Sequence, residues 1–153
     1  MNVRNAINDG VLRYLEKRAA AGTSDVRAPH PDGRDHLQCG SHPDVVERVW
    51  TALGGELPAD CRQLVLGTPA LVHPASGTVL TVALGMAYAL RVPAAVLGAG
   101  LPPGVRTEIV WSNRTRLDLR AEFGPDWVAG NWSAAEPSWC RMSFEEAQGA
   151  ITR

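Results

Sequence analysis

Apolar positions recur at helical spacing at the start of the chain. Between residues 2 and 21 they are Val3, Ile7, Val11, Tyr14, Leu15 and Ala19. Steps of three and four predict an amphipathic helix with one apolar stripe, which Gly22 ends. A lone helix of this length is only marginally stable in water. We therefore expect the stripe to pack on its own domain, on a second copy of the chain or on another protein.

The pattern is lost over residues 23 to 42, where proline, glycine, aspartate and serine follow one another without hydrophobic periodicity. Such composition predicts a loop or linker. Twenty residues without regular structure are unusual inside a compact domain. The expected organisation is thus an N-terminal helix (1–22), a linker (23–42) and a single domain (43–153).

A second helix is predicted to start at Ser41, with Ser41 as the cap, Pro43 in the first turn and Asp44 at the third position of a capping box. Its buried face would contain Val45, Val46, Val49, Trp50 and Leu53. Gly54 and Gly55 end the helix.

Short apolar runs separated by turn residues dominate residues 62 to 92. They predict strands at 61–66, 70–73, 78–84 and 87–92, joined by short connections into an antiparallel meander. In the third strand, strict alternation places Leu80, Val82 and Leu84 on one face and Val79, Thr81 and Ala83 on the other. Both faces are mostly apolar, which favours a central position in the sheet.

The rest of the chain mixes helix and strand. We predict a short helix at 93–99, a hairpin of strands 107–111 and 116–119, and a last helix at 137–150. The fold class is therefore α+β: an antiparallel meander of four to six strands with helices packed on one face.

Composition narrows the class of protein. Across 153 residues the formal net charge is −1, with 45% hydrophobic and 20% charged residues, which is typical of a globular protein. No secretory signal pattern opens the chain, and the longest apolar stretch, 79–90, is too short to span a bilayer. We expect a cytoplasmic location and no membrane partner. Three cysteines, Cys39, Cys61 and Cys140, form no disulfide framework and are expected to be reduced.

The middle of the chain resembles the TfoX N-terminal and YjbR-like α+β domains. The matching residues are Ala70 to Val72, Gly77 to Val82, Tyr88 to Pro93 and Asp126 to Val128, within residues 43 to 130. The first hairpin carries Leu66-Gly67-Thr68-Pro69 where those domains have a Met-Phe-Gly-Gly type segment. The resemblance implies a small domain without cofactor that acts in regulation or nucleic-acid binding.

One constellation could hold a metal ion. His30, His36, Cys39 and His42 fall within thirteen residues of the linker, and imidazole and thiolate are the ligands that zinc prefers. A zinc-binding module organised by His36, Cys39 and His42 is therefore one alternative. An unliganded surface loop is the other, because structural zinc sites favour paired spacings and no second pair is present. Apart from zinc, no cofactor is expected.

No catalytic residue is proposed. Cys39 with His36 or His42 has the types of a nucleophile and base, but no strand-to-helix elbow holds them. Cys61, Cys140 and His73 are interpreted as structural. Enzymatic activity stays open, with non-catalytic function favoured.

Arginine and tryptophan gather in the final third. Arg106, Arg114, Arg116 and Arg120 flank the predicted hairpin and could bind phosphates or carboxylates. Four of the five tryptophans, namely Trp111, Trp127, Trp132 and Trp139, fall within 29 residues. We expect Trp50 and Trp127 in the core, while Trp132 and Trp139 could be core or could line a surface groove.

The leading hypothesis is a non-catalytic protein-binding or regulatory domain that contacts a protein partner or a second copy. Its expected contact residues are Val3, Ile7, Val11, Tyr14, Arg106, Arg114, Arg116, Trp132 and Trp139. The alternatives are the zinc module at His36, Cys39 and His42, and a nucleic-acid-binding regulator that uses the hairpin from Arg106 to Arg120.

Overall fold

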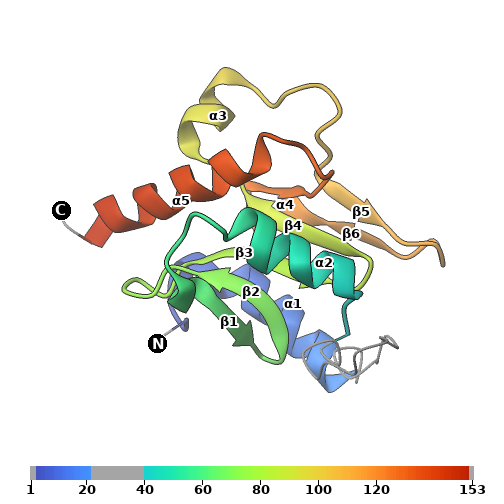
Figure 1. Cartoon of the computed structure of the whole chain (residues 1–153). Helices are drawn as coiled ribbons and strands as arrows, with labels where there is room; N and C mark the ends of the chain where they lie inside the picture. The colour runs from blue at the N-terminus through green and yellow to red at the C-terminus, as the bar shows by residue number, and fades with distance from the viewer. Residues whose placement is uncertain (1–2, 22–39, 152–153) are drawn as a thin grey trace.

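The structure is a computed structural model, and it describes residues 3–21 and 40–151. The predicted α+β class is confirmed (Figure 1). The helices are α1 (Asp9–Ala20), α2 (Pro43–Glu47) with a π-helical continuation (Arg48–Leu53), α3 (Ala94–Ala99), α4 (Leu119–Glu122) and α5 (Glu136–Ile151). The strands are β1 (Arg62–Val65), β2 (Thr68–Val72), β3 (Val79–Leu84), β4 (Ala87–Arg91), β5 (Glu108–Val110), β6 (Arg116–Asp118) and β7 (Trp127–Ala129).

The central sheet has five antiparallel strands in the order β1-β2-β3-β4-β7. Strands β1 to β4 form the predicted meander. The hairpin β5-β6 was also predicted and makes a separate two-stranded sheet. Strand β7 was not predicted, because its three residues follow Gly124-Pro125-Asp126, which reads as a turn. It adds to β4 through pairs such as Leu90 with Val128.

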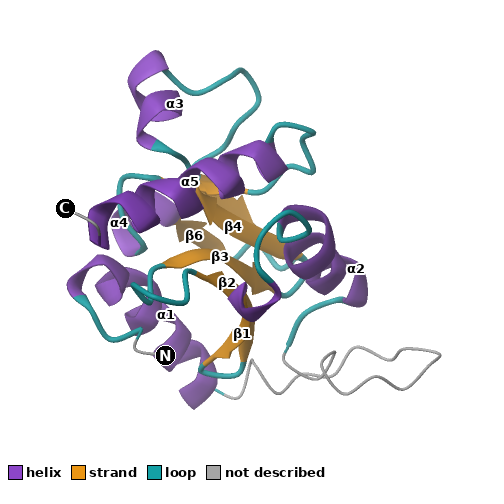
Figure 2. Cartoon of the chain, turned by 60° about the vertical axis from the view of Figure 1, so that its left-hand side comes forward, coloured by secondary structure: helices purple, strands orange, loops and turns teal. Residues whose placement is uncertain are grey.

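Helices cover both faces of this sheet, which corrects the expectation that they pack on one face only. Figure 2 shows α1 and α2 on opposite sides of the strands. One core contains residues of α1, α4 and the β5-β6 hairpin, including Leu15, Leu119 and Ile109. The other contains residues of α2, its π-helical continuation and α5, including Val49 and Trp139. A sheet apolar on both faces must be covered on both.

A β-bulge changes which way the side chains of β3 point. Leu71 pairs with Thr81, but Val72 pairs with Val79, so Leu80 is the extra residue. As a result Val79 joins Val82 and Leu84 in the α1-side core, whereas Leu80 joins Ala83 in the α5-side core. The strict alternation predicted for this strand is therefore wrong at Val79 and Leu80. In β4, which has no bulge, the side chains alternate regularly: Ala89 lies in the α1-side core, and Tyr88 and Leu90 lie in the α5-side core.

Helix α1 belongs to the same core as the sheet. Val11 and Leu15 have no exposed surface and lie against sheet residues. Buried Asn8, just before the helix, donates from its side-chain amide to the carbonyls of Val3 and Gly77 at 2.7 and 2.8 Å. Of the three packing alternatives for the apolar stripe, the structure thus shows the first: the helix packs on its own domain and is not a separate appendage.

The start of α2 also differs from the prediction. The capping residue is His42, whose Nδ1 accepts a hydrogen bond from the backbone N–H of Asp44 at 3.1 Å. Ser41 is buried and its hydroxyl accepts from the backbone N–H of Gly85 at 3.1 Å. The Ser41 side chain therefore connects the start of α2 to the β3-β4 turn, and His42 caps the helix instead.

Candidate functional site

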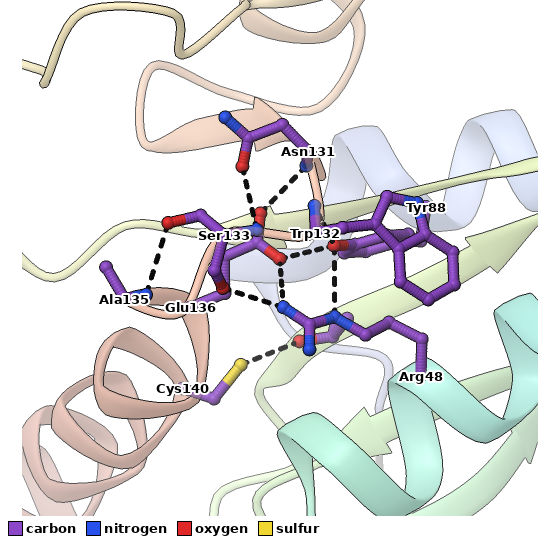
Figure 3. A network of polar contacts seen from close by, with 9 residues as sticks. Arg48, Tyr88, Asn131, Trp132, Ser133, Ala135, Glu136 and Cys140 are labelled. Atoms are coloured by element: carbon purple, nitrogen blue, oxygen red, sulfur yellow. Dashed lines mark hydrogen bonds and ion pairs between the residues drawn. The ribbon is translucent and has the colours of Figure 1, made fainter.

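Three polar side chains from distant parts of the chain meet on the α5 side of the sheet (Figure 3). Arg48 comes from the π-helical segment after α2, Tyr88 from β4 and Glu136 from the first turn of α5. Glu136 is only 1% exposed. A carboxylate that leaves water so completely needs charged and hydrogen-bonding partners.

Both oxygens of this carboxylate are satisfied within the chain. Oε1 accepts from the hydroxyl of Tyr88 and from Arg48 Nη2, the latter at 2.9 Å. Oε2 accepts from the backbone N–H of Asn131 at 2.9 Å. The guanidinium of Arg48 also donates to the Tyr88 hydroxyl at 3.2 Å and to the carbonyl of Ser133 at 2.7 Å. We call Arg48, Tyr88 and Glu136 the buried triad.

The buried triad fixes an unusual backbone conformation at Trp132. This residue has φ of 61°, in the left-handed region that L-residues with side chains rarely adopt. Its backbone N–H donates to the Tyr88 hydroxyl at 2.8 Å. Strain of this kind persists only where surrounding contacts impose it, and it gathers at functional sites.

The indole of Trp132 points outward from this anchor. Trp132 is 53% exposed. One part of its ring lies edge-on against Tyr88, with centroids 5.5 Å apart, and the guanidinium carbon of Arg48 lies 5.5 Å from the indole centroid. The aromatic edge contact and the cation–π contact hold the indole in one orientation. Trp132 is thus both exposed and held in place.

Gly130 is part of the same construction because the loop passes directly over Tyr88. A Cβ built on Gly130 would lie 2.0 Å from Tyr88 Cε2. The backbone N–H of Gly130 donates to the carbonyl of Tyr88 at 2.8 Å. Only glycine permits this approach of main chain to ring.

The chemistry of these groups is that of a structural cluster. Burial, and next the hydrogen bond to Glu136, raises the pKa of Tyr88 well above its ordinary value, so the phenol keeps its proton. Burial also raises the pKa of the Cys140 thiol to about 11, and the Cys140 sulfur lies 3.4 Å from the hydroxyl oxygen of Thr81. A protonated phenol and a protonated thiol are poor nucleophiles at neutral pH. The arrangement is built to hold a surface loop.

The tryptophans that we expected to be core or groove separate clearly. Trp139 is buried in the α5-side core, so its predicted role as a contact residue is wrong. Trp127 is fully buried, as predicted. Trp50 is partly buried and donates from Nε1 to the carbonyl of Ala70 at 2.9 Å. Trp132 alone among these four lies mostly exposed.

The predicted contact residues at the start of the chain also differ in their exposure to solvent. Val11 is fully buried in the chain's own core, so it cannot meet a partner unless α1 leaves the sheet. Val3 and Tyr14 are partly buried against that core. Ile7 is 52% exposed and remains accessible.

The arginines of the late hairpin are exposed but do not form a purely basic face. Arg106, Arg114 and Arg116 all lie at the surface. Arg116 pairs with Glu108 across the hairpin at 3.1 Å. Asp118 uses its carboxylate to cap α4 next to Arg120. Charges of both signs alternate here, which weakens the local field that a nucleic acid would meet.

The proposed metal ligands are only partly within the described residues. His36 and Cys39, together with His30, lie outside them. His42 lies inside and engages its Nδ1 in the α2 cap. Within 3–21 and 40–151, no group of three His, Cys, Asp or Glu residues is placed to hold a metal ion. The zinc module stays a prediction.

No helix of the described segments has both the length and the apolar character needed to cross a membrane.

The buried triad itself was missed by the sequence reasoning. One signal was present: Tyr88 falls on the same strand face as Leu90 and Val92, and a buried tyrosine hydroxyl needs a partner. Arg48 and Glu136 carry no comparable mark, since charged residues at such helical positions are usually solvated.

Comparison of the chain with models of known protein families, with curated proteins and with solved structures found no match. The resemblance to the TfoX N-terminal and YjbR-like domains therefore stays a prediction from the sequence.

Proposed function

We propose that this chain is a non-catalytic protein-binding domain whose contact surface is centred on Trp132. The observation that carries the proposal is the exposed indole of Trp132 on a left-handed backbone, whose main-chain N–H donates to the hydroxyl of buried Tyr88. Tryptophan is, with tyrosine and arginine, one of the residues enriched at the energetic centres of protein interfaces.

Preorganisation is the physical advantage of this arrangement. A side chain that is already held in one orientation loses little conformational freedom when a partner covers it. The contacts of Trp132 with Tyr88 and Arg48 provide that restraint before binding. The buried triad supports the site without facing a substrate, because its acid, phenol and guanidinium are hydrogen-bonded to each other and to the main chain.

The proposal is narrower than the surface expected from the sequence. Val11 and Trp139 belong to the core, and Val3 and Tyr14 are partly covered. Exposed Arg106 would contribute to a polar rim, because its carbonyl accepts from the N–H of Ala129, three residues before Trp132. Such a rim typically adds specificity more than affinity. Arg114 and Arg116 stay predictions from the sequence.

Photo-crosslinking in the cells that naturally produce the chain tests this proposal. The full chain would carry p-benzoylphenylalanine in place of Ala134, an exposed residue two positions after Trp132. A matched chain would carry it in place of Ile151, an exposed apolar residue at the far end of α5. We expect a discrete crosslinked product at position 134 and none at 151. Excess unmodified chain should compete it away, whereas excess Trp132→Ala chain should not. Equal products at both positions, or none at 134, would reject the proposal.

A further inference from the structure

The outer edge of β1 lies at the end of the five-stranded sheet opposite β7. Strand β1 is the first of five in the sheet order and pairs only with β2 among the described strands. The opposite edge is partly closed, because the backbone N–H of Ala129 in β7 donates to the carbonyl of Arg106 at 2.8 Å. Edge strands expose main-chain donors and acceptors that can pair with another chain.

The register of the first hairpin tells which groups face outward. Val65 pairs with Thr68 around the two-residue turn Leu66-Gly67, in which both residues have positive φ. The closing pair of such a hairpin exchanges both hydrogen bonds, and the next pair, Leu64 with Pro69, exchanges none. Proline fits there because it has no N–H to donate. The N–H and carbonyl of Leu64 therefore point away from β2.

A small pocket lies beside this edge. It has a volume of about 140 Å³, and its aliphatic walls come from Val3, Leu12, Leu64, Val65 and Leu66. Leu12 belongs to α1, so the pocket lies between the N-terminal segment and the open strand. Its size suits one branched aliphatic side chain. Arg4, the one charged residue of the lining, forms an exposed pair with Glu16 at 3.0 Å, and such exposed pairs are weak and exchange readily.

We infer that the edge of β1 binds an extended peptide segment of another protein, added to the sheet as a sixth strand. Main-chain bonds to Leu64 would supply affinity, and the pocket would accept an aliphatic side chain from an alternate position of the peptide. Arg4 favours an acidic residue or a terminal carboxylate next to it. This inference is independent of the site at Trp132.

A second copy of the chain is a poorer occupant. β1 is four residues long, and pairing two such edges cannot bury the roughly 800 Å² per partner of a stable interface. A short peptide needs no more than the strand and the pocket.

Selection from a displayed library of random peptides of about ten residues, with the full chain as bait, tests the inference. We expect the selected peptides to share an aliphatic residue with an acidic residue or the peptide's carboxyl end nearby. Isotope-labelled chain titrated with a synthetic selected peptide should show amide shifts at Leu64 and its neighbours. Shifts centred on Trp132, or no selected peptide, would overturn the inference.

A pair of substitutions separates main-chain pairing from mere contact. Leu64→Pro removes the outward N–H without breaking a bond to β2, and proline is tolerated on edge strands in this orientation. Leu64→Ala keeps the N–H. We expect Leu64→Pro to weaken peptide binding about tenfold, and Leu64→Ala, which shortens a side chain that also lines the pocket, to weaken it less. Met86→Ala, at an exposed residue outside both sites, should bind like the unmodified chain. Equal loss in Leu64→Pro and Leu64→Ala would overturn strand addition. Self-association of the unmodified chain in sedimentation, abolished by Leu64→Pro, would assign the edge to a second copy and overturn the peptide.

Discussion

The side-chain oxygen of Asn8 accepts a hydrogen bond from the backbone N–H of Val79 at 2.9 Å, joining residues 71 positions apart. Through the same side chain, the segment before α1 is bonded to Gly77 in the turn before β3. Arg91 reinforces the junction by donating to the carbonyl of Ile7 at 2.9 Å while its guanidinium lies over Trp127. The first helix is therefore held by buried polar contacts as well as by apolar packing.

Asn8→Ala should unfold at lower denaturant concentration than the unmodified chain. The change leaves the N–H of Val79 and the carbonyl of Gly77 buried without their partner. We expect a loss of about 2–4 kcal/mol in the free energy of unfolding, since each buried unsatisfied group costs about 1–3 kcal/mol. Urea titration followed by circular dichroism gives the value. Asn113→Ala, in an exposed turn, is the matched control and should cost less than about 1 kcal/mol. Similar losses for both variants would contradict the anchoring role.

Gly130→Ala should destabilise the loop that carries Trp132. The added methyl group would overlap the Tyr88 ring, and overpacking of this kind costs about 1–3 kcal/mol. Gly98→Ala is the control, because a Cβ there meets nothing within 4 Å and the position is helical, so it should be neutral or stabilise by up to about 1 kcal/mol. Thermal unfolding compares the two. With 19F-labelled tryptophan, the Trp132 resonance should shift in Gly130→Ala and stay in place in Gly98→Ala.

Arg48→Met should cost more than the loss of a surface ion pair. It leaves the carboxylate of Glu136 buried without its cation, and breaking a buried pair from one side costs about 3–5 kcal/mol. Arg141→Met, which breaks an exposed pair with Glu56, should cost less than about 1 kcal/mol. Guanidinium chloride titration measures both.

The double change Arg48→Met with Glu136→Gln then tests whether buried charge is the cause. With no carboxylate left to stabilise, the double variant should be more stable than Arg48→Met alone. If it is less stable by the sum of both single changes, packing rather than charge explains the loss.

Cys61 and Cys140 should react slowly with thiol reagents while the chain is folded. Burial raises the pKa of each thiol from 9.0 to about 11, which at pH 8 lowers the thiolate fraction from roughly one in ten to about one in a thousand. A Cys39→Ser chain isolates these two thiols. We expect negligible labelling with Ellman's reagent in buffer and two reactive thiols in urea. Rapid labelling of the folded variant would contradict their burial.

The same two thiols predict how stability depends on alkaline pH. Each holds its proton more tightly when folded, so the contribution is complete below the unfolded pKa near 9 and is lost as pH rises through about 11. Unfolding free energy should therefore fall between pH 9 and 11. A Cys61→Ala, Cys140→Ala chain provides the comparison, and its curve should be flatter over that interval. Identical slopes would assign the decline to other groups.

The sequence predicts the meander and most helices because each depends on local patterning. The alternation from Ala87 to Arg91 and the apolar stripe from Val11 to Leu15 can be recognised in the local sequence. The bulge at Leu80 cannot be predicted in this way, since it depends on how β2 pairs with β3. Strand β7 cannot be predicted locally either, because three residues after a turn gain strand geometry only by pairing with β4.

The candidate site was harder to predict for a related reason. Trp132 stood out by residue type, but its exposure depends on contacts with Arg48, 84 positions earlier, and with Tyr88, 44 positions earlier. Trp139, of the same type and seven residues later, is core because α5 turns it toward the sheet. Long-range contacts, not composition, separate the two.

The bulge in β3 also determines which length changes the fold can accept. Without Leu80, Val79 would still face the α1 side and Thr81 the α5 side, because the two halves of the strand would then alternate without interruption. A chain one residue shorter at this position would keep every other inward side chain in its own core. Loss of a residue elsewhere in the strand would exchange side chains between the two cores, so length variation among relatives of this protein should concentrate at the bulge.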